Sequence, residues 1–501
     1  MSKMSKLLCA SLEGFDAICV DIESTFTKGL PSFSIVGLGN NAIQESKDRI
    51  KSALLINEFK FPPKRITINL SPSEIVKKGS HLDCAMALLI ALNEKKVDFK
   101  NFYVFGELGL GGELKDTNSI FILILSLVRK GIIKNVLIPK ESIPKISTIP
   151  NLNIYAVENL SEAIDFFTLQ NIEQNRVTNK NFNYHKISIK NKDYYYDTSY
   201  KIDFSDVKGQ YVAKRAALIA SAGNHNIIFV GSPGCGKSMI SKRLQYIMPP
   251  MSLEEILDKA KMDSLENKQL DFAPIRAFIS PHHSSTKASI IGGTKVGEIA
   301  LCNNGILFFD ELPHFSKTII EAMREPLEDY SVLVSRVNTK IKYPTKFLFI
   351  SAMNPCPCGN LLSKSKECRC NEIEIKRYKN RLSEPFLDRL DIHVIMNEIQ
   401  KEDKGDVNSK LLHDLVIKAF IFQKNRGQVE LNGKLNEQDI QKYCVLDTQS
   451  QIILNKAIDN FTLSFRVINK ILKISRTIAD IEQSINIEVK HILEAISYRN
   501  R

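Results

Sequence analysis

Hydrophobic and polar positions in the first third of the chain follow the two periods expected of strands and helices. Short runs rich in β-branched and aromatic residues predict strands at residues 33–36, 65–70, 103–105 and 135–138. Apolar residues three and four positions apart predict intervening helices at residues 41–55, 84–92 and 121–130. Residues 1–168 are therefore expected to form a compact α/β domain.

The pattern changes twice in the rest of the chain. Residues 171–200 are rich in Asn, Lys, Gln and Tyr and show no period, so we place a linker at residues 169–200. Apolar runs then predict buried parallel strands at residues 227–230, 306–309 and 347–351, within an α/β core spanning residues 201–397. Beyond this core, helical spacing predicts a small helical domain at residues 398–501, with helices at 411–425, 449–457, 465–480 and 489–498.

Composition is that of an ordinary soluble globular protein. The 501 residues are 44% hydrophobic and 25% charged. The longest apolar run, residues 120–128, is shorter than the roughly 20 residues that span a bilayer, and no cleavable leader pattern precedes Glu13. We therefore expect a cytoplasmic protein without a membrane partner. The formal net charge of +12 permits a nucleic acid or another polyanion as partner without requiring one.

A glycine-rich motif follows the predicted strand at residues 227–230 and precedes a predicted helix at 239–248. In this position the backbone N–H groups of such a loop surround phosphates, its lysine reaches the β and γ oxygens and its hydroxyl ligates Mg²⁺. The alternative is a glycine-rich turn without a ligand, but the strand and helix around it favour ATP and Mg²⁺. The loop consists of Gly231, Ser232, Pro233, Gly234, Cys235, Gly236, Lys237 and Ser238.

Polar side chains also follow the next two predicted strands of this core. Asp310 and Glu311 end the apolar run at residues 306–309, where Asp310 is expected to hold Mg²⁺ through water. Glu311 is expected to orient and deprotonate the attacking water. Asn354 follows the third run and is placed to contact the γ-phosphate or that water, although a bare Asn-Pro turn is the alternative.

Further motifs lie at residues 206–210, 281–284, 292–293, 297–298, 304–311, 354–359 and 387–391. Their order and spacing resemble the AAA+ ATPases over nearly the whole chain, and most closely the ComM/YifB family of the magnesium-chelatase-like branch. The resemblance implies a Lon-protease-like N-terminal α/β domain, an AAA+ parallel-sheet ATPase core and a small C-terminal helical lid. It also implies a hexameric ring that moves branch points in DNA during recombination in natural transformation.

The same resemblance assigns roles to four residues by their positions in the family's motifs. Val207 and Gln210 would flank the adenine. Arg389 would be the arginine finger that reaches the neighbouring subunit's γ-phosphate, and Arg466 would be the sensor arginine of the lid. From the residues alone, Arg389 and the acids beside it could equally form a surface ion-pair cluster. The chain departs from the family at Thr294 and Asn303, where the family usually has glycine and histidine.

The N-terminal domain resembles a Lon-protease fold without its catalytic dyad. A serine–lysine dyad needs a nucleophile and a lysine that activates it. Here the serine position is His81 and the lysine position falls near Phe121. The domain is therefore expected to be a scaffold or a substrate contact, with Ser80 and Lys115 as the one substitute pair.

Four of the ten cysteines crowd into two Cys-x-Cys pairs, Cys356 with Cys358 and Cys368 with Cys370. Four soft ligands can close a tetrahedral Zn²⁺ site. Reduced, metal-free thiols are the alternative, because the spacing differs from the commoner Cys-x-x-Cys knuckle. His282 and His283 could also ligate a metal, but their motif favours a structural or pore-loop role.

Two functions are open at this point. The first is an ATP-driven motor on single-stranded or branched DNA, without sequence specificity. The second is an AAA+ remodeller of a protein or of a chelatase-type metal-insertion complex, which would need partner subunits with an integrin-like domain not found in this sequence. For a DNA motor, backbone binding needs cations, and the candidates are Lys287, Lys295, Arg336, Lys340, Lys342 and Lys346.

Overall fold

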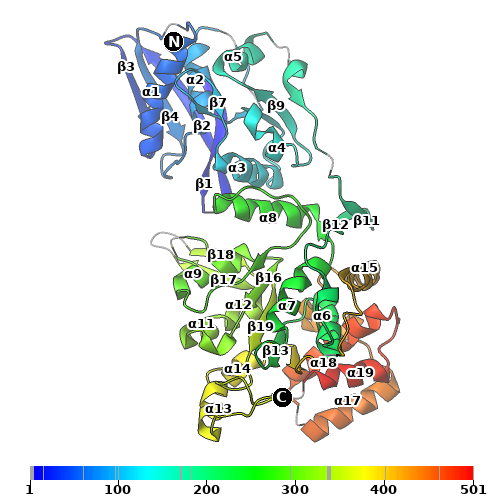
Figure 1. Cartoon of the computed structure of the whole chain (residues 1–501). Helices are drawn as coiled ribbons and strands as arrows, with labels where there is room; N and C mark the ends of the chain where they lie inside the picture. The colour runs from blue at the N-terminus through cyan, green and yellow to red at the C-terminus, as the bar shows by residue number, and fades with distance from the viewer. Residues whose placement is uncertain are drawn as a thin grey trace. The chain divides into compact units, whose positions relative to one another are not determined.

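A computed structural model of the chain describes residues 5–14, 16–59, 61–95, 97–99, 101–169, 172–180, 182–293, 295–335, 340–400, 402–461 and 463–499. Two residues named above, Thr294 and Arg336, lie outside this described part. The chain divides into two compact units (Figure 1). They comprise Met1–Asn183 with Ala260–Asp271, and Tyr184–Lys259 with Phe272–Arg501.

The first unit is built on an eight-stranded mixed sheet of order β10-β9-β8-β5-β1-β2-β4-β3. β1, β2 and β4 pair antiparallel, whereas β1, β5, β8 and β9 pair in parallel. The strands are β1 Ser5–Glu13, β2 Asp16–Thr27, β3 Ser32–Val36, β4 Arg65–Ser71, β5 Phe102–Val104, β6 Glu107–Leu108, β7 Leu114–Lys115, β8 Asn135–Pro139, β9 Asn153–Val157 and β10 Arg176–Val177. The helices are α1 Asn41–Ile56, α2 Asp83–Ala91, α3 Asn118–Arg129, α4 Ile143–Ile146 and α5 Leu160–Thr168.

The predicted strands and helices of this unit are present, and the longest apolar run forms the buried helix α3. The hairpin of β1 and β2, paired from Ser5↔Ser24 to Glu13↔Asp16, was missing from the prediction. In β2, Val20, Ile22 and Ser24 are buried, and the residues between them are partly exposed. The alternation is therefore in the sequence, but serine in place of an apolar residue weakens it.

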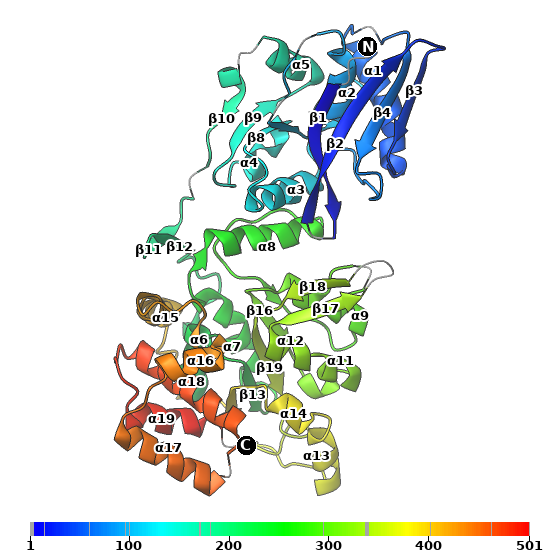
Figure 2. The ribbon, with the colours of Figure 1, turned by 180° about the vertical axis from the view of Figure 1, so that it is seen from behind.

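The second unit contains a five-stranded parallel sheet of order β15-β16-β19-β13-β20, which confirms the predicted parallel-sheet core. Figure 2 shows β13, β16 and β19 from behind. Because these strands are parallel neighbours, their carboxyl ends meet at one edge, where α/β proteins bind ligands. The sheet strands are β13 Ile227–Gly231, β15 Phe278–Ile279, β16 Ile306–Phe309, β19 Leu348–Met353 and β20 Ile392–Met396.

Two smaller strand groups belong to the same unit. The hairpin of β17, Ser331–Ser335, and β18, Lys340–Pro344, is inserted between β16 and β19. The segment expected to be a linker contains a second hairpin, β11 His185–Ile189 with β12 Lys192–Tyr196, and β12 pairs with β14 Met251–Ser252. Tyr194 of this hairpin packs edge-on against Phe420, with ring centroids 5.0 Å apart.

Helices cover the sheet and form the C-terminal part of the unit. Before the C-terminal part, the helices along the chain are α6 Tyr211–Gly223, α7 Lys237–Arg243, α8 Leu253–Leu265, α9 Lys287–Ile291, α10 Glu298–Leu301, α11 Lys317–Ala322, α12 Arg324–Asp329, α13 Glu372–Lys379 and α14 Glu384–Leu387. The last residues of α8, from Ala260, belong to the first unit. The predicted helical domain contains α15 Ser409–Asn425, α16 Glu437–Tyr443, α17 Thr448–Phe461, α18 Phe465–Ile481 and α19 Val489–Ser497.

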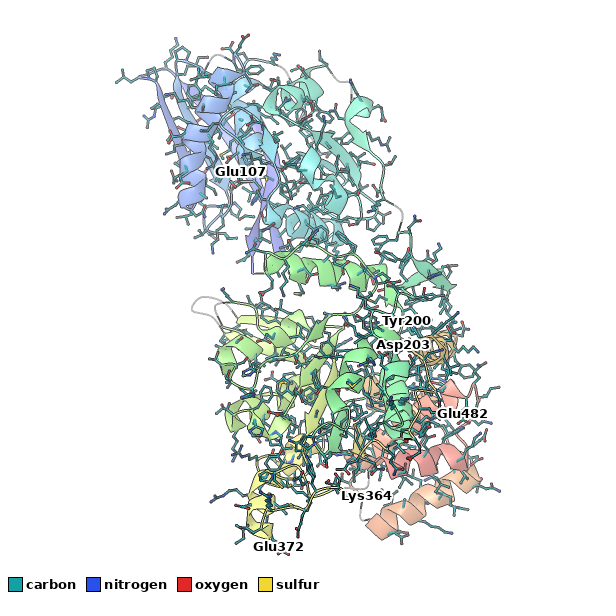
Figure 3. The ribbon with its side chains drawn as sticks, viewed as in Figure 1. Glu107, Tyr200, Asp203, Lys364, Glu372 and Glu482 are labelled. Carbon is teal, nitrogen blue, oxygen red and sulfur yellow. The ribbon has the colours of Figure 1, made fainter. Side chains whose placement is uncertain are left out.

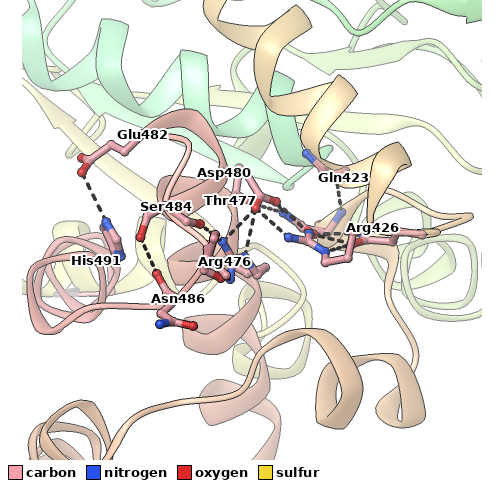
Figure 4. Close-up of polar contacts among 12 residues, drawn as sticks. Gln423, Arg426, Arg476, Thr477, Asp480, Glu482, Ser484, Asn486 and His491 are labelled. Carbon is pink, nitrogen blue, oxygen red and sulfur yellow. Dashed lines mark hydrogen bonds and ion pairs between the residues drawn. The ribbon is translucent and has the colours of Figure 1, made fainter. Parts of the chain in front are cut away.

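A buried polar network joins the C-terminal helices (Figure 4). Asp480 near the end of α18 is fully buried and accepts hydrogen bonds from Arg426 at 2.8 and 2.9 Å and from Arg476 at 3.0 Å. Asn432 donates to the same carboxylate at 2.8 Å. A buried carboxylate with this many donors is satisfied and orients its helix. The network therefore holds α18, which carries Arg466 in its first turn.

The sequence predicts no membrane-spanning helix, and the length and hydropathy of the helices in the structure bear on this prediction. In the described part of the chain, none of the helices combines the length and the apolar character that a bilayer crossing requires.

Candidate ATP site and metal centre

The glycine-rich loop lies at the carboxyl end of β13, which lies between β19 and β20, and leads into α7. Gly234 and Gly236 have φ values of 83° and 95°, a region that favours glycine. A Cβ on Gly231 would come within 2.7 Å of Cys235 Sγ, so the loop also needs glycine where it leaves the strand. The backbone therefore adopts the tight turn that a phosphate-binding loop requires.

Lys237 and Asn354 are brought together by neighbouring strands. Lys237 begins α7, and its Nζ donates to Asn354 Oδ1 at 3.1 Å and to the carbonyls of Gly231 and Ser232 at 2.6 and 3.0 Å. Burial lowers the pKa of Lys237 below its usual value. The predicted partners of the γ-phosphate thus lie within hydrogen-bond distance of each other.

The predicted magnesium ligands also meet. Ser238 Oγ donates to Asp310 Oδ2 at 2.9 Å, from the first turn of α7 to the end of β16. A hydroxyl and a carboxylate oxygen are ligands that suit Mg²⁺, which keeps several waters of its own. Glu311 follows with a left-handed φ of 52°, and its side chain is exposed. It therefore stands beside the Ser238–Asp310 pair and is open to water.

The residues assigned to the adenine lie just before α6. Val207 is 1% exposed and belongs to the core that packs under the sheet. Gln210 has a left-handed φ of 55°, and its Nε2 donates to Cys235 O at 3.1 Å and Asn397 O at 2.5 Å. Gln210 therefore links the start of α6 to the phosphate loop, and its position as an adenine neighbour stays a prediction.

The two arginines assigned to a neighbouring γ-phosphate and the lid converge on one carboxylate that the sequence did not single out. Arg389 and Arg466 each form an ion pair with Glu328 of α12. Among the described residues, their side-chain hydrogen bonds and ion pairs are with Glu328, Arg324 and Pro385, and none is with the phosphate loop. Glu328 had no local signal, because α12, α14 and α18 meet only in the folded chain.

Arg389 is presented by a firmly anchored turn. Asp391, two residues later, accepts a hydrogen bond from the backbone N–H of Asn226 at 2.9 Å and pairs with Lys470 Nζ at 2.8 Å. Asn226 Nδ2 also donates to the Arg389 carbonyl at 3.3 Å. Buried carboxylates are stable when paired in this way. The motif at residues 387–391 therefore contains Arg389 and also fixes the backbone that carries it.

The four clustered cysteines come together in space. The Sγ atoms of Cys356, Cys358 and Cys368 lie 3.4 to 3.7 Å apart, and all four ligand atoms, Cys370 included, lie within 4.8 Å of one another. A tetrahedral Zn²⁺ with Zn–S bonds of about 2.3 Å places its sulfurs about 3.8 Å apart. Disulfide sulfurs would be about 2.05 Å apart. Hydrogen bonds from the backbone of Asn360 and Arg369 lower the pKa of Cys358 to about 6, whereas burial and the other thiols raise the pKa of Cys370 to about 12.

The residues at the Lon-like dyad positions make other contacts. Ser80 Oγ donates to the carboxylate of Glu107, which Figure 3 labels. His81 is fully buried, with Nε2 2.9 Å from Ala10 O and Nδ1 3.1 Å from Ser119 Oγ, and burial lowers its pKa to about 4. A neutral imidazole held on both sides is a structural residue. Lys115 lies opposite Glu107 in the β6–β7 pair, and among the described residues no hydrogen bond joins it to Ser80.

The candidate DNA contacts separate into two groups. Lys340 and Lys342 are exposed on one face of β18, and Lys287 and Lys295 are exposed on the segment around α9. The two segments touch, because a Cβ on Gly292 would lie 3.3 Å from Val334 Cγ2 of β17. Lys346 instead pairs with Glu430 at 2.5 Å. The rings of His282 and His283 lie 4.1 Å apart and that of His283 6.2 Å from His314, so these histidines pack together.

Comparison with known proteins places this arrangement in a family. Family models described as "Subunit ChlI of Mg-chelatase", "Magnesium chelatase, subunit ChlI" and "Magnesium chelatase, subunit ChlI C-terminal" match residues 22–142, 203–404 and 406–499. The competence protein ComM of Haemophilus influenzae is 34% identical over 499 residues, which cover 97% of this chain and 95% of ComM. The uncharacterized protein YifB of Salmonella typhimurium is 34% identical over 505 residues, with the same coverage.

A more distant relative is the maternal DNA replication licensing factor mcm6 of Xenopus tropicalis, 20% identical over 294 residues that cover 54% of this chain and 32% of mcm6. The nearer relatives align over almost their full length, and the phosphate loop, the acidic strand end and the helical C-terminal part all fall within the matched ranges. The chain therefore belongs to the ComM/YifB family of magnesium-chelatase-like AAA+ ATPases.

Proposed function

We propose that this ATPase is a ring-shaped motor that acts on DNA and moves branch points during recombination in natural transformation. ATP hydrolysis requires a phosphate loop, a magnesium ligand and a base, and Lys237, Ser238, Asp310 and Glu311 supply them. The competence role is taken from the name of ComM and the link to DNA also from that of mcm6. The observation that carries the proposal is a basic surface built directly into the ATPase core.

This basic surface consists of the two touching insertions. The β17–β18 hairpin lies between β16, which leads to Asp310, and β19, which leads to Asn354. It presents Lys340 and Lys342 on one face, next to the segment that carries Lys287 and Lys295. Lysine side chains bind the phosphate groups of DNA, and phosphate contacts do not depend on the base sequence. A shift of this hairpin on binding DNA would act directly on both strands that carry the hydrolytic residues.

A ring is proposed because Arg389 and Arg466 are held away from the phosphate loop of their own chain. An arginine finger supplied by a neighbour stabilises charge on the transferred phosphoryl group and couples hydrolysis to assembly. The resemblance to AAA+ proteins suggests six subunits. In this ring, Arg389 would exchange Glu328 for the neighbour's nucleotide.

The alternative function is remodelling of a protein or of a chelatase-type complex. The test is the ATPase rate of the purified ring with and without single-stranded, forked and four-way DNA, together with the dissociation of labelled junctions. A DNA motor is stimulated by branched DNA and dissociates the junction. A ring that hydrolyses ATP, yet neither binds these DNAs at low salt nor dissociates them, would refute the motor and favour the remodeller.

The lysines of the hairpin give a sharper prediction. Replacing both Lys340 and Lys342 with alanine is expected to weaken DNA binding by about 10- to 50-fold in 0.1 M salt, because two phosphate contacts are lost. The slope of log affinity against log salt should fall in magnitude by about one to two. Fluorescence anisotropy with forked DNA measures both.

The matched control replaces Lys410 and Lys418, two exposed lysines of α15, with alanine. This control removes the same charge and should bind DNA like the parent. Equal losses in the two double variants would show that net charge, not the hairpin, sets the affinity.

We further propose that Cys356, Cys358, Cys368 and Cys370 bind one structural Zn²⁺. The sulfur spacing supports this, since it fits a tetrahedral metal and exceeds a disulfide bond. Protein purified without chelator is expected to contain about one zinc per chain, and Cys368→Ser should lose most of it. Elemental analysis decides the point, with Cys19→Ser in the first unit as control. A stoichiometry near zero in the parent would favour free thiols.

A further inference from the structure

The cysteine cluster and the ATP site share one stretch of chain. Asn354, which accepts a hydrogen bond from Lys237, precedes Cys356 by two residues. The turn that starts at Cys356 is closed by a hydrogen bond from the Gly359 N–H to the Cys356 carbonyl at 3.0 Å. This turn contains two of the four clustered thiols. Any ligand that fixes Cys356 and Cys358 therefore fixes the turn that follows Asn354.

The same turn touches the phosphate loop. Gly359 has a φ of 80°, and a Cβ at this position would lie 2.6 Å from Pro233 Cδ and 2.8 Å from Pro233 Cγ. Real Cβ atoms do not approach this closely, so even a methyl group would displace one of the two loops. The metal-binding turn and the phosphate loop are thus in direct backbone-to-ring contact within one unit.

The second cysteine pair is followed by α13, a helix that contacts Asn354. Cys370 is followed by Asn371, which caps α13, and Figure 3 labels Glu372, the first residue of this helix. Tyr378 of α13 is buried, and its hydroxyl forms a hydrogen bond with the backbone of Asn354. The four thiols therefore join the two ends of a loop, one at Asn354 and the other at the helix that supports Asn354.

Apart from the thiols, this loop has few buried contacts and is held mainly at its tip. Leu361 and Leu362 are 38% and 41% exposed, so apolar burial contributes little. At the tip, Glu398 accepts hydrogen bonds from Ser363 Oγ, from the Lys364 N–H at 3.2 Å and from Ser365 Oγ at 3.1 Å, and the last two are exposed to water. A loop that buries few apolar residues needs a cross-link to be ordered, and in small protein segments a bound metal often provides it.

We infer that the metal and nucleotide sites are thermodynamically linked: zinc on the four cysteines raises the affinity of the phosphate loop for ATP, and ATP raises the affinity for zinc. The inference rests on the proposed zinc site. Zinc orders the turn of Gly359 and fixes Asn354 before the nucleotide binds. Nucleotide binding is then not opposed by the loss of conformational entropy of this turn. Linkage requires the two effects to be equal in magnitude.

The experiment titrates a fluorescent, non-hydrolysable ATP analogue into zinc-loaded protein and into protein stripped of zinc under reducing conditions and returned to Mg²⁺. The stripped protein is expected to bind the analogue about 5- to 150-fold more weakly, and added Zn²⁺ should restore binding. Competition with a zinc-sensitive dye should show zinc held more tightly by the same factor when the analogue is present. Cys19→Ser, treated identically, should behave like the parent.

Gly359→Ala tests the contact without touching a thiol. It is expected to keep about one zinc per chain, to weaken analogue binding, and to lose the dependence of that binding on zinc. Parent affinity in zinc-loaded Gly359→Ala, or equal affinity in loaded and stripped parent protein, would overturn the linkage and leave the zinc site standing. Absence of zinc from the parent would overturn both. Neither outcome bears on ATP hydrolysis or on DNA, which are tested separately.

Discussion

Glu311→Gln is expected to lower the rate of ATP hydrolysis by about 100- to 10,000-fold, the range for loss of a general base. Glutamine keeps the size of the side chain and its ability to accept a hydrogen bond, but it cannot take a proton from water. The Ser238–Asp310 pair and Lys237 are unchanged, so ATP and Mg²⁺ should still bind. Phosphate release under single turnover measures the first effect, and titration with a fluorescent ATP analogue measures the second.

Glu437→Gln, at an exposed carboxylate of α16, is the matched control and should hydrolyse ATP like the parent. Hydrolysis by Glu311→Gln at the parent's rate would show that another group activates the water. Loss of nucleotide binding in the same variant would show instead that Glu311 helps to hold the metal or the phosphates.

Mixing two inactive variants is expected to restore activity if Arg389 completes a neighbour's site. Arg389→Ala should lose about 1,000- to 100,000-fold in rate, the range for an arginine finger, and Lys237→Ala should not turn over at all. In a randomly mixed ring, about one quarter of the interfaces combine an intact Lys237 with an intact Arg389 from the next subunit, because each interface is head-to-tail. Steady-state ATPase assays of equimolar mixtures measure the recovery.

The control mixes Arg389→Ala with the double variant Lys237→Ala/Arg389→Ala, which offers no intact finger. This mixture should remain inactive. If the first mixture assembles, as judged by light scattering, and is no more active than the control, Arg389 does not act across the interface.

The candidate hydrolytic residues could be predicted from the sequence because their spacing along the chain is local. The phosphate loop must follow a strand and begin a helix, and residues 227–238 carry both signals. Asp310 and Glu311 follow an apolar run. Carboxylates at the end of a buried strand must lie at a polar edge of the sheet. Parallel strands bring such ends together, so the contact of Lys237 with Asn354 and of Ser238 with Asp310 followed from the strand predictions.

Weaker patterns were missed for a related reason. The β1–β2 hairpin and the strands in the expected linker alternate less clearly, since serine, lysine or tyrosine occupy positions that face the interior or a neighbouring element. Sheet pairing stabilises these strands, and pairing depends on partners far along the chain.

The sequence by itself determined the family, the parallel-sheet core and the identity of the residues that can handle ATP, Mg²⁺ and a soft metal, because these depend on residue type and local spacing. Only the tertiary structure decided which of them meet. It placed Arg389 and Arg466 together on Glu328, paired Lys346 with Glu430, and set Gly359 of the cysteine turn against Pro233. Each of these contacts joins segments that are distant in sequence, so packing of the whole unit creates them.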